Sequence, residues 1–225
     1  MAPADRCFVP AQHGLDERGA CGERGVVQHR SAFLVALLTA LWLAMWLLGG
    51  PFSAADRGLL PLFHASALVA EALVVTRLGN AYILLPLSLA ALIVIALRRG
   101  RRSALLYLVL VLSGRALVEA QKDLIGRLRP DPAGRLDAVT SFSFPSAHAA
   151  NSMVAWLGFA LIVAPPRYRP AAVAAALALA MLVGLTRLVL AVHWPSDVIG
   201  GWAFGAAWTL LLLRLVQGTS PPLRH

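Results

Sequence analysis

Two residues near the end of the chain have the spacing of an activated nucleophile. His193 and Asp197 flank a short turn that contains Pro195, so the carboxylate lies within reach of one imidazole nitrogen. A hydrogen bond between them fixes the tautomer of the ring and leaves its other nitrogen free to act as a base or nucleophile. Taken alone, the segment is also compatible with a His–Trp anchor at a membrane surface, followed by an aspartate that caps a helix.

A second candidate site lies where an apolar segment begins. Ser146 follows Pro145 and is a typical helix N-cap, so the free N–H groups and the positive dipole end of the following helix would bind an anion. Ala147 is small enough to let that anion approach the backbone, and His148 would lie beside it in the first turn. This pattern alone is weak, because Pro-Ser is common at helix starts and a histidine there is usually only solvated.

Three cations complete the set of candidate residues. Lys122 and Arg129 are seven residues apart, which is two helical turns, and Pro130 is expected to end their helix at the next loop. Arg187 lies near the end of an apolar segment, where a charge is costly unless it is paired or binds an anion. With the histidines, Asp197 and the helix start, they supply what phosphoryl transfer requires: donors for the phosphate oxygens, a nucleophile with its orienting group, and an acid.

The composition places these residues in a membrane protein. Of the 225 residues, 59% are hydrophobic and only 14% are charged, and the mean hydropathy is +0.71. These values exclude a water-soluble globular enzyme and a disordered chain. The net charge of +9 does not indicate a nucleic-acid partner, because many basic residues stand at the ends of apolar segments and form no stripe with aromatics. The two cysteines, Cys7 and Cys21, are interpreted as free thiols.

Six apolar segments are long enough to cross about 30 Å of hydrocarbon as helices. They are residues 32–48, 81–97, 103–120, 146–164, 171–190 and 198–216. Residues 31–217 are therefore expected to form one six-span domain, between a flexible N-terminal tail, 1–30, and a C-terminal tail, 218–225, both cytoplasmic. Residues 59–75 are interrupted by Pro61, His64 and Glu71, so we expect an additional amphipathic helix at the membrane surface there, with a seventh span as the alternative.

Arginine clusters indicate which helix ends face the cytoplasm, because cytoplasmic loops are rich in arginine and lysine. Arg98, Arg99, Arg101 and Arg102 follow the second apolar segment, and Arg167 and Arg169 follow the fourth. Arg214 lies near the end of the last segment, and Arg224 follows it. The opposite face then holds residues 121–145 and 191–197. We expect a multi-pass protein of a bacterial inner (plasma) membrane, with its site facing the periplasm or exterior.

Three motifs together resemble those of the type 2 phosphatidic acid phosphatase (PAP2) superfamily, which also contains undecaprenyl-diphosphate phosphatases, glucose-6-phosphatase and the vanadium haloperoxidases. The motifs are Lys122-x6-Arg129-Pro130, Pro145-Ser146-Ala147-His148 and Arg187-x5-His193-x3-Asp197. Ala147 stands where glycine is usual and Thr186 where serine is usual, and both replacements stay small. The resemblance implies an all-α, polytopic membrane fold with a PAP2/haloperoxidase-like helical core.

The resemblance also implies a role for each matching residue. His193 would attack phosphorus and form a phosphohistidine, Asp197 would hold its ring, and His148 would protonate the leaving oxygen and then activate water. The phosphate oxygens would be bound by Lys122, Arg129, Ser146, the Ala147 N–H and Arg187. No metal or other cofactor is implied, because fixed cations replace it. Two histidines and one aspartate can also form a facial triad, which remains the metal-binding alternative.

The implied substrate is a membrane lipid whose tail stays in the bilayer: a prenyl diphosphate, phosphatidic acid or phosphatidylglycerol phosphate. A lipid phosphotransferase could use the same covalent intermediate. A transporter or scramblase without catalysis is the alternative from a different class, which inverted repeats would support; the sequence shows none. Gly201 and Gly205, spaced as small-x3-small, are interpreted as a site of close helix packing. The choice of lipid and the oligomeric state are not fixed by the sequence.

Overall fold

A computed structural model describes residues 16–64 and 67–218, and every regular element in these ranges is helical. The long helices are α1 (Asp16–Leu48), α4 (Ala81–Arg99), α5 (Arg101–Ile125), α6 (Ala147–Val163), α7 (Arg169–Val189) and α8 (Pro195–Gly218). The short helices are α2 (Ala54–His64), α3 (Val69–Val75), η1 (Thr76–Gly79), η2 (Pro132–Gly134) and η3 (Pro166–Tyr168).

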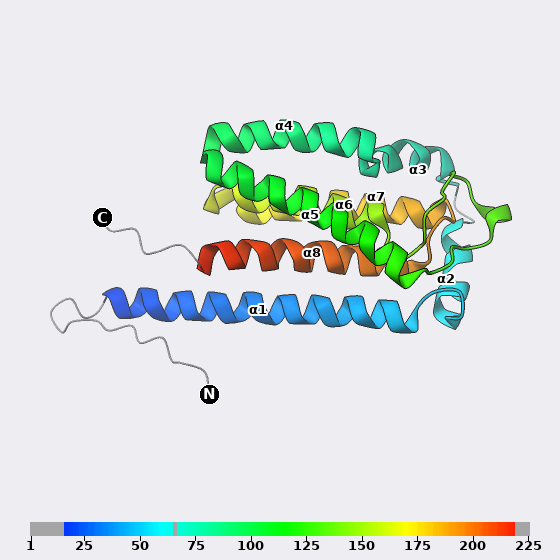
Figure 1. The fold of residues 1–225 in the computed structure, drawn as a ribbon, viewed down its shortest axis with the longest axis horizontal. Coiled ribbons are helices and arrows are strands. Elements are labelled where there is room, and N and C mark those ends of the chain that lie inside the picture. The colour runs from blue at the N-terminus through cyan, green and yellow to red at the C-terminus, as the bar shows by residue number, and fades with distance from the viewer. Residues whose placement is uncertain (1–15, 65–66, 219–225) are drawn as a thin grey trace.

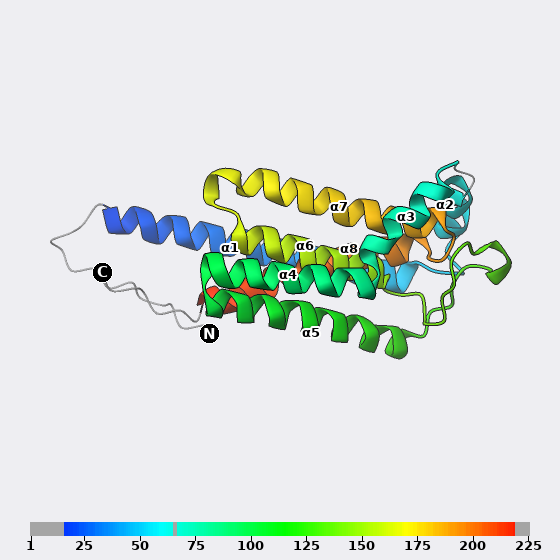
Figure 2. The same cartoon turned by 90° about the horizontal axis from the view of Figure 1, so that it is seen from above.

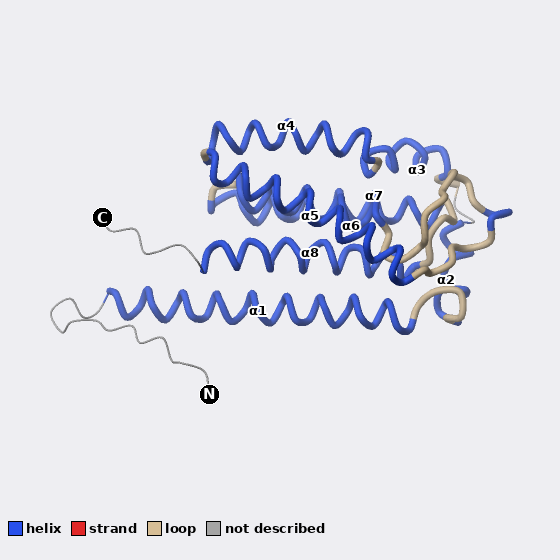
Figure 3. The backbone as a smooth tube through the Cα atoms, viewed as in Figure 1, coloured by secondary structure: helices blue, strands red, loops and turns tan. Residues whose placement is uncertain are grey.

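The six long helices run side by side in one bundle (Figure 1). Helix α6 is its centre: it packs against α4, α5, α7 and α8, and most of its side chains are buried. Seen from above, α7 lies on one side of α6 and the α4–α5 pair lies on the other (Figure 2). Helix α1 packs along α8. The short helices α2 and α3 and the long loop after α5 gather at one end of the bundle, and the α4–α5 and α6–α7 turns lie at the opposite end (Figure 3).

The predicted all-α membrane fold is confirmed. Among the described residues, five helices are long and apolar enough to cross a membrane, and they correspond to five of the six predicted segments. The remaining segment forms α6, which is apolar but has only 17 residues. Helix α6 lies inside the bundle, in contact with α4, α5, α7 and α8.

Helices α6 and α8 approach closely at two glycines. A Cβ atom added at Gly201 would lie 2.8 Å from the carbonyl oxygen of Ser146, and one added at Gly205 would lie 2.6 Å from that of Ala150. Both separations are too short for a side chain, so only glycine permits this contact between backbones. The predicted packing role of the two glycines is confirmed, and the contact places the start of α8 beside the start of α6.

Helix α5 ends earlier than predicted. Its last residue is Ile125, and Gly126 follows in the left-handed conformation with φ +61°, donating its N–H to the Lys122 carbonyl. This is a common glycine stop for a helix. Pro130 is therefore not the residue that ends the helix, and Arg129 lies on the loop instead of two turns along the helix from Lys122.

Two other segments differ from expectation. Helix α1 begins at Asp16, so residues 16–30, predicted as part of a flexible tail, are helical; residues 1–15 and 219–225 lie outside the described part of the chain. The predicted surface helix at 59–75 is not continuous. Helix α2 and the following helical stretch Val69–Gly79 are bent by 102° from each other, around residues 65–66, which are not described. Counted as one broken span, the pair would raise the number of candidate spans to six.

The opposite positions of the arginine turns and of the loop after α5 give a test of sidedness. Ala133 and Arg101 are both exposed. Arg101 begins α5 beside the α4–α5 turn, and Ala133 belongs to η2 in the loop after α5, so they lie toward opposite ends of the bundle (Figure 3). In a background without Cys7 and Cys21, we expect Ala133→Cys to react with an impermeant thiol reagent added to intact cells, and Arg101→Cys to react only after the membrane is permeabilised. The reverse pattern, or labelling of both before permeabilisation, would show that the orientation is misassigned.

Candidate active site

The carboxylate of Asp197 is fully buried in the first turn of α8 and is held on both oxygens. Its Oδ2 accepts hydrogen bonds from Ser143 Oγ at 2.5 Å and from the Trp194 N–H at 2.8 Å. Its Oδ1 accepts from Arg127 at 2.9 Å. The positive end of the α8 dipole also favours an anion at this position. Asp197 therefore has a single fixed orientation.

His193 lies in the turn between α7 and α8, against this carboxylate. The turn begins at Ala191, whose left-handed backbone (φ +52°) redirects the chain after α7. His193 Nδ1 lies 3.4 Å from Asp197 Oδ2, and Nε2 lies 3.0 Å from a guanidinium nitrogen of Arg129. Because a guanidinium can only donate, Nε2 is the acceptor and Nδ1 carries the proton. The lone pair of Nε2 therefore points toward the cations.

The surroundings keep the His193 imidazole neutral. Burial, together with the positive charges of Arg129, Lys122 and Arg187, lowers the pKa of His193 well below its usual value of 6.5. The charged form would need to be desolvated beside three cations, so it is disfavoured at neutral pH. A neutral ring with a free lone pair is the state that a nucleophile requires.

Lys122 and Arg129 converge although they do not share a helix. Lys122 Nζ donates to the Phe142 carbonyl at 2.8 Å and to Ser141 Oγ at 3.2 Å. Arg129 donates to the Ser141 carbonyl at 2.7 Å and to the Val192 carbonyl at 2.7 Å. Burial and the nearby charge of Arg187 lower the pKa of Arg129 to about 10, so the guanidinium stays charged at neutral pH.

Arg187 is fully buried near the end of α7. One guanidinium nitrogen donates to Thr76 Oγ1 at 2.6 Å and to the Asp137 carboxylate at 2.9 Å, and its Nε atom is buried without a hydrogen-bond partner. Asp137 belongs to the loop after α5 and is partly exposed. The pair satisfies the sequence-based expectation that a cation here needs an anion.

The start of α6 lies beside the start of α8. Ser146 is the N-cap residue, as predicted, and its N–H donates to the Asp197 carbonyl at 3.0 Å. Its side chain makes no capping bond, however, and its buried Oγ has no hydrogen-bond partner. Ala147 is the first residue of the helix. The first N–H groups of an α-helix have no partner within the helix, so this end presents donors for an anion.

His148 is oriented by the segment that precedes α4. Its Nε2 lies 2.6 Å from Asn80 Oδ1, and the amide nitrogen of Asn80 donates to the Tyr82 hydroxyl, which fixes the orientation of the amide. His148 Nε2 is therefore protonated, and Nδ1 is left free. A Cβ atom added at Gly79 would lie 2.7 Å from the His148 ring, so glycine is required for this approach. The same short segment thus contacts both His148 and, through Thr76, Arg187.

Several residues that position the site were not predicted from the sequence. One of them is the buried Arg127, which contacts Asp197 and Ser196 Oγ and also donates to the carbonyls of Met45 and Trp46 at the end of α1. Asp56 accepts hydrogen bonds from the N–H and hydroxyl of Ser196. The others are Ser143, Asn80 and Asp137. Arg127 and Ser143 could have been noticed as unassigned polar residues in or beside a motif, but Asp56, Asn80 and Asp137 lie away from the motifs and carry no such signal.

Arg115 and Glu119 are four residues apart on one face of α5, a spacing typical of a structural ion pair, but their side chains do not pair. The ion pairs within the described part of the chain are Arg127–Asp197, Arg187–Asp137 and His193–Asp197. Over the same residues, no three His, Cys, Asp or Glu side chains gather as metal ligands would, so the facial-triad alternative gains no support from the geometry.

Comparisons with known proteins agree with the motifs. A family model described as the PAP2 superfamily matches residues 103–220. Phosphatidylglycerophosphatase B of Bacillus subtilis is 34% identical over 156 residues, which are 67% of this chain and 74% of that protein. An undecaprenyl-diphosphatase of Sulfolobus acidocaldarius is 28% identical over 151 residues, 65% of this chain and 69% of that protein.

The fold is also similar to a solved structure. The crystal structure of a transmembrane PAP2 type phosphatidylglycerolphosphate phosphatase from Bacillus subtilis superposes with a TM-score of 0.73 at 25% sequence identity, covering 86% of this chain and 98% of that one. The region matched by the family model includes every predicted site residue and more than half of the chain. The chain belongs to the PAP2 superfamily.

Proposed function

We propose that this protein is an integral-membrane phosphatase that hydrolyses a phosphomonoester or diphosphate of a membrane lipid through a phosphohistidine on His193, at the outer face of the membrane. The observation that carries the proposal is the environment of the His193 ring. Asp197 lies against Nδ1, and the lone pair of Nε2 points at Arg129. A phosphate group bound by Arg129 would bring its phosphorus to that lone pair.

The phosphate-binding groups are the three cations and the start of α6. Ser146 Oγ and Arg187 Nε are buried polar atoms without a partner among the described residues, and a phosphate oxygen would satisfy each of them. Lys122 and the Ala147 N–H supply further donors. The Asp137 carboxylate, which now pairs with Arg187, is partly exposed and gives way to the phosphate when substrate binds.

The reaction then has two halves. In the first, His193 Nε2 attacks phosphorus, the bond from phosphorus to the lipid oxygen breaks, and His148 gives a proton to the departing oxygen. Because Nε2 of His148 bonds to Asn80, that proton must leave from Nδ1. Nδ1, which is free in the structure, first takes this proton from the phosphate monoanion as the substrate binds, and then gives it to the departing oxygen. In the second half, His148 takes a proton from water, the oxygen attacks phosphorus, and the P–N bond breaks to release phosphate.

The chemistry of the surroundings supports a lipid substrate. The site lies at one end of a bundle whose helices are apolar enough to cross a membrane. The names of its relatives include phosphatidylglycerophosphatase and undecaprenyl-diphosphatase, which act on phosphorylated lipids of different tails. A phosphorylated lipid can place its head group in the site while its tail stays in the bilayer.

Because the phosphate-binding groups are side chains and a helix end, no divalent metal is required. We expect phosphate release from phosphatidic acid by the purified protein to be unchanged in EDTA and inhibited by vanadate, which resembles the transition state of phosphoryl transfer. Loss of activity on chelation, restored by one particular metal ion, would contradict the proposed site.

The roles of the two histidines can be separated by trapping the phosphoenzyme. The reaction with radiolabelled lipid substrate is quenched with acid, and the base-stable label left on the protein is measured. We expect none on His193→Ala, because this variant lacks the nucleophile. His148→Ala is expected to slow hydrolysis of an alkyl phosphate by about 10²–10⁴-fold, the usual contribution of a general acid. It should slow hydrolysis of p-nitrophenyl phosphate much less, because that leaving group needs no proton.

The two variants control for each other, since both remove one imidazole from the same site. In His148→Ala the attack of water on the phosphohistidine also loses its base, so label is expected to accumulate. Trapped label on His193→Ala together with its absence on His148→Ala would exchange the two roles.

A further inference from the structure

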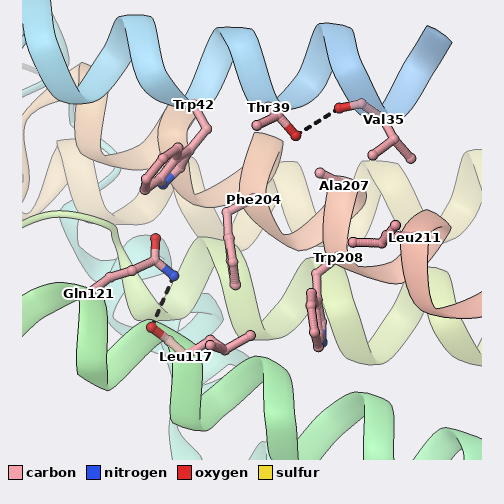
Figure 4. A pocket seen from close by; sticks show the side chains of 9 residues that line it. All are labelled: Val35, Thr39, Trp42, Leu117, Gln121, Phe204, Ala207, Trp208 and Leu211. Carbon is pink, nitrogen blue, oxygen red and sulfur yellow. Dashed lines mark hydrogen bonds between the residues drawn. The ribbon is translucent and has the colours of Figure 1, made fainter. Parts of the chain in front are cut away.

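A groove on the membrane-spanning part of the bundle lies between α1, α5 and α8. It has a volume of about 310 Å³, and most of its wall is hydrocarbon, from Val35, Leu117, Phe204 and Leu211 among others (Figure 4). From Trp42 to Val35 it extends over seven residues of α1, which is about 10 Å along the helix. An apolar pocket of this size is large enough to enclose part of a lipid chain.

Two residues that line the groove each have a buried polar atom without a hydrogen-bond partner in the described part of the chain. Trp42 Nε1 and Gln121 Oε1 are buried, and neither has a hydrogen-bond partner among the residues that the structure describes. The amide nitrogen of Gln121 is already used, because it donates to the Leu117 carbonyl at 3.0 Å. One donor and one acceptor are therefore left unpaired in an otherwise apolar wall, and buried polar atoms normally have partners.

Both atoms lie at the end of the groove that is nearest the active site. Trp42 and Gln121 are the lining residues closest to the C-terminal ends of α1 and α5. Gln121 directly precedes Lys122. The Trp42 ring lies 6.2 Å from that of Phe144, and the Phe144 ring lies 4.3 Å from the guanidinium carbon of Arg127, which binds Asp197. The polar end of the groove is thus next to the residues that hold the site.

We propose that this groove binds an acyl chain of the lipid substrate, with the Trp42 N–H donating to the ester carbonyl that joins this chain to glycerol. Gln121 Oε1 would accept from a hydroxyl of the same lipid or from water beside it. An acyl phospholipid has a carbonyl within a few bonds of its phosphate and only hydrocarbon beyond, which matches the order of polar and apolar groups in the groove. A prenyl chain has no group that could pair with the indole N–H. The inference rests on the proposed phosphatase function and adds the substrate class.

Two phosphatidic acids that differ only in the carbonyl test this inference. Dioleoyl phosphatidic acid has ester-linked chains, and its dioleyl ether analogue lacks the carbonyl. We expect the unmodified protein to show a kcat/KM about fivefold or more higher for the ester, the usual effect of one neutral hydrogen bond. Trp42→Phe should bring that ratio to about one, because it keeps an aromatic ring and removes the N–H.

The matched control is Trp156→Phe. Trp156 Nε1 is also buried without a partner, but it belongs to a different cavity, between α6 and α7 and away from the site. This variant should leave the ester-to-ether ratio as it is in the unmodified protein. A second variant tests the hydrocarbon part: Ala207→Phe fills the groove and should raise KM for dioleoyl phosphatidic acid while leaving KM for the dihexanoyl lipid nearly unchanged.

The outcomes distinguish the two proposals. If the unmodified protein releases no phosphate from either lipid, the proposed function itself fails. If it hydrolyses the ester and the ether equally well, or if Trp42→Phe leaves their ratio unchanged, the phosphatase assignment stands and the groove proposal is wrong. An equal loss of the ratio in Trp156→Phe would also overturn it, since the effect would then not be specific to the groove.

Discussion

The buried ion pair between Arg127 and Asp197 is the contact on which the geometry of the site depends. A charge pair inside a protein is stable only when further hydrogen bonds satisfy both partners, because removing either one leaves an uncompensated charge that typically costs about 3–5 kcal/mol. Here Asp197 also accepts from Ser143 and from the Trp194 N–H, and Arg127 also donates to Ser196 and to two carbonyls at the end of α1. Together these hydrogen bonds join the end of α1, the loop after α5 and the start of α8.

These contacts explain how separate helices build one site. The carbonyls at the end of α1 carry the negative end of its dipole and so favour the Arg127 cation, while the start of α8 favours the Asp197 anion. The hydrogen bonds between Ser196 and Asp56 connect α2 to the start of α8. The backbone hydrogen bond from Ser146 to Asp197 connects the start of α6 to it. Because both terminal guanidinium nitrogens of Arg127 donate to protein groups, we propose that it acts by positioning Asp197 and does not bind phosphate.

Much of this architecture is predictable from the sequence, and what is not has a physical reason. The apolar segments predict the long helices, because hydrocarbon thickness sets their length. The resemblance of the three motifs to those of the PAP2 superfamily predicts that His193, Asp197 and Arg187 belong to one site. Arg127 bonds to residues 45, 46, 196 and 197, which are about 70 to 80 positions away in the sequence. The spacing of neighbouring residues in the sequence cannot indicate contacts between residues so far apart. The end of α5 was misplaced at Pro130 because Gly126, one turn earlier, already ends the helix in the left-handed conformation.

The most direct test of this account is a double-mutant cycle on Arg127 and Asp197, with the rate of phosphoenzyme formation measured in a single turnover. If Arg127 acts only by positioning Asp197, Arg127→Met should slow this step by at least about tenfold in the otherwise unmodified protein and by less than about twofold in the Asp197→Asn background, since coupled residues are not additive. Each variant must run as a monodisperse, folded species in detergent. Equal slowing by Arg127→Met in both backgrounds would contradict the account, because Arg127 would then contribute independently of Asp197.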